Sequence, residues 1–223
     1  MADIRKDFSV FCVADGMGGY SNGERASEMV ISFIREWIGE KSPTSLRECI
    51  DQLEVIIHKA NEQIFRQFNV SETSGTTASV LVIWDDLYAL MTCGDSRVYL
   101  HRGESVQQLS RDDVWQNMPG IAESLTQEEI RHHPSYGKLT AAIGIEESCS
   151  INVSTGEVQA GDCFLLCSDG VYKLLSDEEL LSYTGRLLTA GQIMMKFALN
   201  RMADRINKKG APDNYSAIIV KIK

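Results

Sequence analysis

Two stretches of this chain end an apolar run on Asp-Gly, a pattern that can place a carboxylate at the edge of a β-sheet. The first is FCVADG, which ends in Asp15 and Gly16, and the second is FLLCSDG, which ends in Asp169 and Gly170. The glycine permits a positive φ and lets the backbone approach a ligand closely. Either copy alone would be interpreted most simply as a turn, because Asp-Gly is a common turn sequence.

Two further acids lie beside apolar runs. Asp95 follows the run in LMTCGDS, and Asp213 precedes the last one in APDNYSAIIV. Acids gathered at one sheet edge repel each other unless cations neutralise them, and oxygen ligands without His or Cys favour Mg²⁺, Mn²⁺ or Ca²⁺. GMGGYSNG fits neither a dinucleotide-binding nor a phosphate-binding loop, and the residues after Asp15 do not fit an EF-hand. The spacing leaves a carboxylate metal site and a set of simple turns as the two interpretations.

The elements that must position these acids follow from the apolar periodicity. Helical spacing predicts helices over residues 23–40, 45–68, a short stretch near 124–131, 171–183 and 189–207. Strands are predicted at 8–14, 76–84, 87–94, 97–103, 104–110, 149–158, 162–168 and 215–222. Asp85-Asp86 between two of them indicates a hairpin. This order predicts an α+β fold in which helices flank an antiparallel β-sandwich, with residues 1–223 as a single domain.

Composition limits the class of partner. A net charge of −9 over 223 residues disfavours nucleic acids and anionic membranes, which would repel such a surface. No apolar run is long enough to span a membrane, and the first residues lack the basic and apolar regions of a signal peptide. We therefore expect a cytoplasmic protein whose six cysteines are reduced and mostly buried.

Taken in order, these motifs resemble the metal-dependent protein Ser/Thr phosphatases of type 2C in their short bacterial form. The resemblance covers roughly residues 8–222. It rests on VADGMGGYSNGERAS (13–27), SGTTASVLVI (74–83), CGDSRVYL (93–100), LSRDD (109–113), HHPSYGKLTAAIG (132–144), DCFLLCSDGVYKLLSDEEL (162–180) and PDNYSAIIVKI (212–222). The resemblance implies layers in the order αββα and a flap at about residues 111–140 that influences substrate choice.

The resemblance also implies roles for individual residues. Asp15 would bridge two Mn²⁺ or Mg²⁺ ions, with the Gly16 carbonyl on one of them, and Asp169 and Asp213 would hold the other. Asp112 and Asp169 would hold a third, weaker ion near the flap. Asp95 and Asn214 would orient strands and ligands. A metal-activated water then attacks phosphoserine or phosphothreonine, so that Asp15, Asp169 and Asp213 act in catalysis through the metal. The implied partners are phosphorylated proteins, including a Ser/Thr kinase or its substrates.

The chain departs from the family at its start. Members normally carry two more strands, which supply a phosphate-binding Arg and a Glu-Asp motif, whereas this chain has only MADIRKD before Phe8. Loss of the Arg should weaken phosphate binding. Loss of the strands should expose a sheet edge through which an otherwise monomeric chain could self-associate. Two alternatives remain: a degenerate member that binds phosphoproteins as a regulatory module, and a structural protein whose acids are turns.

Overall fold

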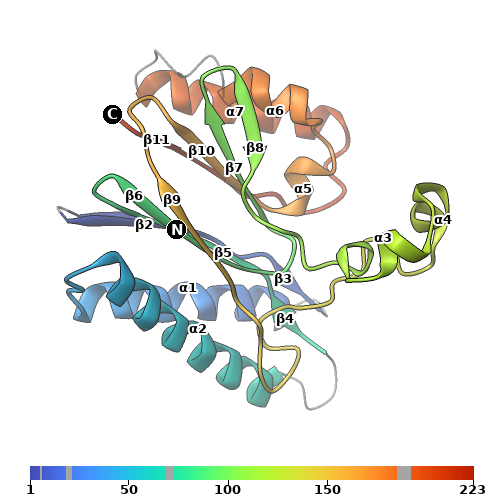
Figure 1. Ribbon diagram of the computed structural model, residues 1–223, viewed down its shortest axis with the longest axis horizontal. Coiled ribbons are helices and arrows are strands. Elements are labelled where there is room, and N and C mark those ends of the chain that lie inside the picture. The colour runs from blue at the N-terminus through green and yellow to red at the C-terminus, as the bar shows by residue number, and fades with distance from the viewer. Residues whose placement is uncertain (6, 19–21, 69–72, 185–191) are drawn as a thin grey trace.

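The computed structural model describes residues 1–5, 7–18, 22–68, 73–184 and 192–223. Its elements form four layers in the order α, β, β, α (Figure 1). One outer layer consists of α1 (Asn22–Glu40) and α2 (Leu46–Phe68). The other consists of α5 (Asp169–Tyr172), α6 (Asp177–Thr184) and α7 (Gln192–Lys208). The prediction of an α+β fold with helices flanking a β-sandwich is confirmed.

Two antiparallel sheets form the inner layers. The sheet beside α1 and α2 has the order β1 (Ala2–Ile4), β2 (Phe8–Val13), β5 (Ala78–Trp84), β6 (Leu87–Cys93) and β9 (Asn152–Glu157). The sheet beside the other helices has the order β11 (Ala217–Lys221), β10 (Cys163–Cys167), β7 (Arg97–Arg102) and β8 (Ser105–Gln108). Trp84 pairs with Leu87, which leaves Asp85-Asp86 as the predicted two-residue hairpin turn. A short pair, β3 (Gly16–Met17) with β4 (Gly75–Thr76), lies at the end of β2.

Strands with both faces buried explain why these runs are apolar throughout. On β2, Val10 and Cys12 face the α1–α2 layer, whereas Phe11 and Val13 pack between the two sheets. Successive side chains of a strand point to opposite faces, so one strand contributes to two apolar clusters. Together with the cluster under α5–α7, the three clusters fill the three spaces between the four layers.

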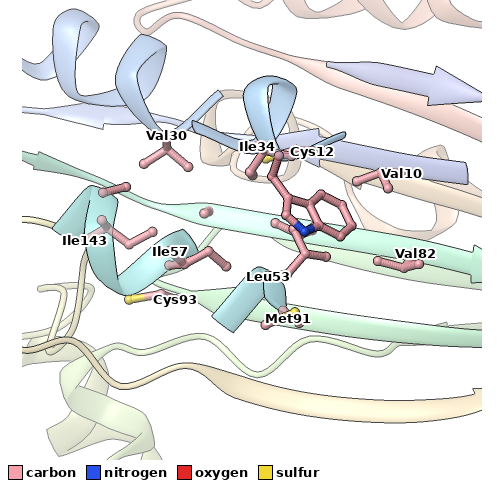
Figure 2. Packing of buried hydrophobic residues seen from close by; sticks show 14 of the residues in the cluster. Val10, Cys12, Val30, Ile34, Leu53, Ile57, Val82, Met91, Cys93 and Ile143 are labelled. Carbon is pink, nitrogen blue, oxygen red and sulfur yellow. The ribbon is translucent and has the colours of Figure 1, made fainter. Parts of the chain in front are cut away.

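Figure 2 shows how the helices cover the first sheet. Ile34 of α1 and Leu53 of α2 are fully buried and lie over Val10 and Val82 of the sheet. Burial of each such side chain contributes about 1.5–3 kcal/mol. Cysteines join these clusters as small apolar residues, and all six are free thiols, with five buried and Cys149 half-buried. The prediction of reduced, mostly buried cysteines agrees with this placement.

Two predicted helices are wrong in extent, because each is interrupted by a cap. The helix predicted over 171–183 is divided into α5 and α6, since Ser176 and Glu179 hydrogen bond to each other's backbone N–H and start α6 anew. The helix predicted near 124–131 corresponds to α4 (Gln127–His132), which begins later than predicted because Thr126 and Glu129 form the same reciprocal cap; a separate short helix, α3 (Ile121–Ser124), precedes it. Both positions carry the Ser/Thr-x-x-Glu pattern that begins a helix.

The start of the chain also differs from expectation. No strand was predicted within residues 1–7, yet β1 pairs with β2 and covers its outer edge. Among the described strands β11 pairs with β10 alone, and residues 216–218 along it border a hollow of about 700 Å³. Self-association through such an edge stays a prediction. The helices of the described ranges include none that is long and apolar enough to cross a membrane.

Candidate metal centre

A single pocket brings together the four acids that follow or precede predicted strands. It has a volume of about 540 Å³ and lies where both sheets end. Its lining includes the predicted site residues Asp15, Gly16, Asp95, Asp169 and Asp213, together with Thr77, Lys138 and Lys173. Of the described residues predicted for the site, Asp112 and Asn214 lie outside this lining. Gly19 of the first motif falls outside the described residues.

Asp15 is held through its backbone. Its N–H donates to Thr77 Oγ1 over 3.1 Å, and its carbonyl accepts from the Thr77 N–H over 2.8 Å. Gly16 then enters the β3–β4 pair, where a Cβ would stand 2.1 Å from the Gly23 carbonyl oxygen. The glycine is required here because the first turn of α1 packs directly on the backbone. As a result the Asp15 side chain is presented to the pocket by a rigid junction.

Asp169 and Asp213 are brought together by hydrogen bonds between the two chain segments that carry them. The Ser168 N–H donates to the Ser216 carbonyl over 3.1 Å, and the Ser216 N–H donates to Ser168 Oγ over 3.0 Å. At Gly170 a Cβ would lie 2.2 Å from the carbonyl oxygen of Asn214, so the two backbones touch. Asn214 therefore supports the pocket through its backbone, while its own side chain is exposed.

Asp95 is nearly buried and takes part in a chain of contacts. The Tyr172 hydroxyl donates to Asp95 Oδ2 over 3.1 Å, and the Arg97 guanidinium lies 3.7 Å over the Tyr172 ring. Arg97 is in turn paired with Asp112, whose side chain is 9% exposed. The chain of contacts connects the pocket with the base of the flap. Asp112 thus lies behind the pocket wall, joined to it through Arg97 and Tyr172.

The electrostatics of the pocket are those of acids without enough counter-charge. Burial, followed by the charge of the neighbouring Asp169 and the charges of Asp213 and Asp95, raises the pKa of Asp15 to about 7. Burial and the charge of Asp169 likewise raise the pKa of Asp95. Mutual repulsion of this kind is relieved when cations enter. The pocket is therefore arranged to attract positive charge.

The donor set fits divalent cations that prefer oxygen. Asp169 Oδ1 is buried without a hydrogen-bond partner, while Oδ2 of the same carboxylate is 2.5 Å from Lys173 Nζ. An orphaned carboxylate oxygen is costly unless a cation or donor reaches it. Within the described part of the chain, no three His, Cys, Asp or Glu side chains stand close enough to form a ready-made metal cluster. Binding of a metal would therefore have to draw these carboxylates together.

The predicted flap, residues 111–140, projects from the body beside β3 and β4 at the right of Figure 1. Its two ends are joined by the bridge between Val114 and Leu139, and the Trp115 and His133 rings stack at 3.9 Å. The returning arm places Lys138 and Leu139 on the pocket wall. The flap is consequently part of the site.

Sequence reasoning missed the three other residues of the described lining whose side chains are polar or charged. Thr77 lies in the quoted motif SGTTASVLVI but was given no role, although it holds Asp15 and hydrogen bonds to Ser96 Oγ over 2.7 Å. Lys173 and Lys138 were also missed. For Lys173 a signal existed, because Asp169 and Lys173 are four residues apart and meet on one helical face. For Lys138 no local pattern is informative.

Comparison with known proteins places this geometry in a family. The family model described as "Protein phosphatase 2C" matches residues 2–208. The chain is 28% identical over 217 residues to Serine/threonine protein phosphatase PstP of Mycobacterium tuberculosis, covering 96% of this chain and 40% of that protein. It is 29% identical over 215 residues to Protein phosphatase PhpP of Streptococcus pneumoniae, covering 95% of this chain and 85% of that protein.

Solved structures agree with the sequence comparison. The crystal structure of the Mycobacterium tuberculosis phosphatase PstP/Ppp superimposes with a TM-score of 0.81 at 26% identity, covering 100% of this chain and 91% of that one. The catalytic domain of PstP in complex with two manganese ions gives a TM-score of 0.75 at 25% identity, covering 99% and 91%. With the matched family model spanning nearly all of the fold, this chain belongs to the protein phosphatase 2C family.

Proposed function

We propose that this chain is an Mn²⁺- or Mg²⁺-dependent phosphatase that hydrolyses phosphoserine and phosphothreonine in proteins. The observation that carries the proposal is the pocket of four acids in which Asp169 Oδ1 is buried without a partner. Membership of the phosphatase 2C family supports it, as do the relatives named Ser/Thr phosphatases and the related structure with two manganese ions.

Each residue of the pocket has a proposed task. Asp15 and the Gly16 carbonyl would hold one ion, and Asp15 would share the second with Asp169 and Asp213. When bound, two such ions supply an activated water and neutralise charge on the phosphoryl group during in-line transfer. Asp95 would hold the Tyr172 hydroxyl in place, and Asn214 would hold the turn at Gly170, so that the neighbouring metal ligand Asp169 keeps its position.

Asp112 remains our prediction for a third, weaker ion shared with Asp169. Such an ion would require Arg97 to leave Asp112, because Arg97 Nε and Nη2 already donate to both carboxylate oxygens. The need to break this pair is a physical reason for weak binding at that position.

The substrates we propose are phosphorylated proteins, among them a Ser/Thr kinase or its targets. A protein substrate reaches the pocket across its open side, and the flap forms one rim through Lys138 and Leu139. Exposed flap side chains such as Met118 and Tyr136 would then contact residues that flank the phosphate. Exchange of residues 111–140 for those of a relative should change substrate preference.

The test is hydrolysis of p-nitrophenyl phosphate and of a phosphothreonine peptide, with Mn²⁺ and with EDTA. We expect metal-dependent turnover that falls by about a hundredfold or more in Asp169→Asn, since a ligand carboxylate is lost. Asp51→Asn is the matched control, because Asp51 is an exposed acid of α2 that pairs with Arg47 far from the pocket in sequence and layer. Equal turnover in EDTA, or an unaffected Asp169→Asn protein, would contradict the proposal.

A regulatory module that binds phosphoproteins without turning them over is the second candidate. The described lining of the pocket favours it, because that lining includes no arginine that could bind a phosphate through two N–H donors and so support turnover. Binding of Mn²⁺ and of phosphothreonine peptide by calorimetry, with no measurable hydrolysis, would establish this candidate.

A further inference from the structure

Lys173 occupies a position in the pocket that the proposed metal chemistry does not explain. It lies one helical turn after Asp169, and its Nζ is 2.5 Å from Asp169 Oδ2. The side chain lines the pocket and yet is 58% exposed, so the ammonium group stands at the open side of the site. A surface ion pair would be of little consequence, but this one holds a cation against a metal-ligand candidate.

The two oxygens of Asp169 have different surroundings. Oδ2 accepts from Lys173, whereas Oδ1 is buried without a partner. Asp169 can therefore use Oδ1 for a metal while Oδ2 keeps Lys173 in place. An ammonium group has three N–H donors, and among the described contacts Asp169 takes one. The remaining donors can bind an anion that enters the pocket.

A second lysine, on the flap, also lines the pocket. Lys138 lines the wall, and its backbone is fixed by hydrogen bonds of 2.9 Å to the Trp115 N–H and 3.0 Å to the Ser135 carbonyl. Lys173 belongs to the body and Lys138 to the flap, so the two cations border the pocket from different parts of the fold. Among the described residues that line this pocket there is no arginine.

With two divalent ions bound, the net charge of the pocket would be neutralised by a ligand that carries two negative charges. Four carboxylates balance two divalent ions, and the two ammonium groups balance the dianion of a phosphate monoester. A phosphodiester carries a single negative charge and would leave one ammonium group unmatched. Lysine binds phosphate as a point charge, which suits an oxygen that extends beyond the metals.

We propose that Lys173, held by Asp169 and assisted by Lys138, binds the phosphoryl oxygens and selects phosphate monoesters over diesters. This proposal rests on the pocket being the phosphate site of the proposed function. It assigns the phosphate-binding cation of this chain to the residue that directly follows α5, the short helix that begins with Asp169. A purely local role for Lys173, as the partner of Asp169 in α5, is the competing interpretation.

The experiment measures binding of inorganic phosphate to the Mn²⁺-loaded protein by calorimetry, alongside a Mn²⁺ titration. We expect Lys173→Met to weaken phosphate binding about tenfold to a hundredfold, the value of one charge-assisted contact, with Mn²⁺ stoichiometry unchanged. Lys173→Arg should recover affinity to within about threefold. Lys59→Met, a change of an exposed lysine on α2, is the matched control and should bind phosphate as the unaltered protein does.

Selectivity supplies a second readout. In Lys173→Met the ratio of kcat/KM for p-nitrophenyl phosphate to that for bis-p-nitrophenyl phosphate should fall about tenfold, mainly through KM for the monoester. Unchanged phosphate binding together with altered Mn²⁺ affinity would overturn the proposal and leave Lys173 as a local partner of Asp169. Phosphate binding that depends on Lys173 in a protein without turnover would support it, while the proposed phosphatase function would fail.

Discussion

The ion pair of Arg97 with Asp112 offers the sharpest quantitative test of how the site is supported. Arg97 reaches the Asp112 carboxylate through three N–H···O contacts of 3.1, 3.0 and 2.7 Å. It also donates to the Tyr99 hydroxyl over 2.9 Å. The Arg97 side chain is 24% exposed and that of Asp112 is 9% exposed, so water replaces little of the interaction.

The expected loss in the free energy of unfolding depends on which charged or polar group each substitution leaves without its partner. Removal of one partner from a buried ion pair costs about 3–5 kcal/mol, because the remaining charge is desolvated. We expect the low end, about 3 kcal/mol, for Arg97→Met, since Gln108 Nε2 still donates to Asp112 over 2.8 Å. Asp112→Asn should cost about 1–2 kcal/mol, because its amide oxygen still accepts hydrogen bonds. The double variant should resemble Asp112→Asn, so the coupling should equal the cost of Arg97→Met, about 3 kcal/mol.

The assay is urea unfolding of the four proteins in EDTA, followed by circular dichroism. The exposed pair of Arg47 and Asp51 serves as the control cycle, with an expected coupling of about 0.3–0.5 kcal/mol. A coupling below about 0.5 kcal/mol for Arg97 and Asp112 would refute the reasoning. In that case Asp112 is not held by Arg97 in solution, and it is free to bind the third ion that we predicted from the resemblance.

Two further predictions concern the metal site and the C-terminal helices. Gly16→Ala should lower Mn²⁺ affinity or unfold the β3–β4 pair, because the added Cβ would stand 2.1 Å from the Gly23 carbonyl oxygen. In the control, Gly39→Ala, the added Cβ meets nothing within 4 Å and should stabilise α1. Calorimetry measures the Mn²⁺ affinity of both variants, and thermal unfolding measures their stability. Hydrogen bonds from Lys209 and Arg205 lower the pKa of Glu179 to about 2 from its ordinary 4.5, so the stability this gives is present above about pH 4.5 and is lost as pH falls towards 2. The urea midpoint of Glu179→Gln should therefore fall less between pH 5 and pH 2.5 than that of the unaltered protein, and equal falls would contradict this.

The layers of the fold were predictable because apolar periodicity records which faces are buried. Residues 87–94 were predicted as a strand from their apolar run, and β6 spans Leu87–Cys93. The same pattern could not show where α5 ends, since the break depends on a cap at Ser176 within a continuous apolar rhythm. It also missed β1, whose three residues are stabilised by pairing with β2 rather than by their own composition.

The acids of the candidate site could be predicted from the sequence, but the residues that hydrogen bond to them could not. An acid beside an apolar run can be identified as a candidate site residue from the local sequence alone, as Asp15 and Asp169 were. Thr77 supports Asp15 from 62 residues away, and Tyr172 reaches Asp95 from 77 residues away. Such contacts are set by how sheets and helices pack, and no spacing within the sequence contains them. For the same reason the pairing of Asp112 with Arg97 was not foreseen.

The position of the pocket follows from the way the two sheets are stacked. Asp15 and Asp95 follow β2 and β6 of one sheet, whereas Asp169 and Asp213 flank β10 and β11 of the other. Neither sheet alone gathers enough carboxylates to hold two divalent ions. The spacing between the two pairs is fixed by the apolar cluster that separates the sheets, where Phe164 is fully buried. The interior between the sheets therefore determines the distance between the two pairs of acids, and any loss of packing there would change the geometry of the proposed metal site.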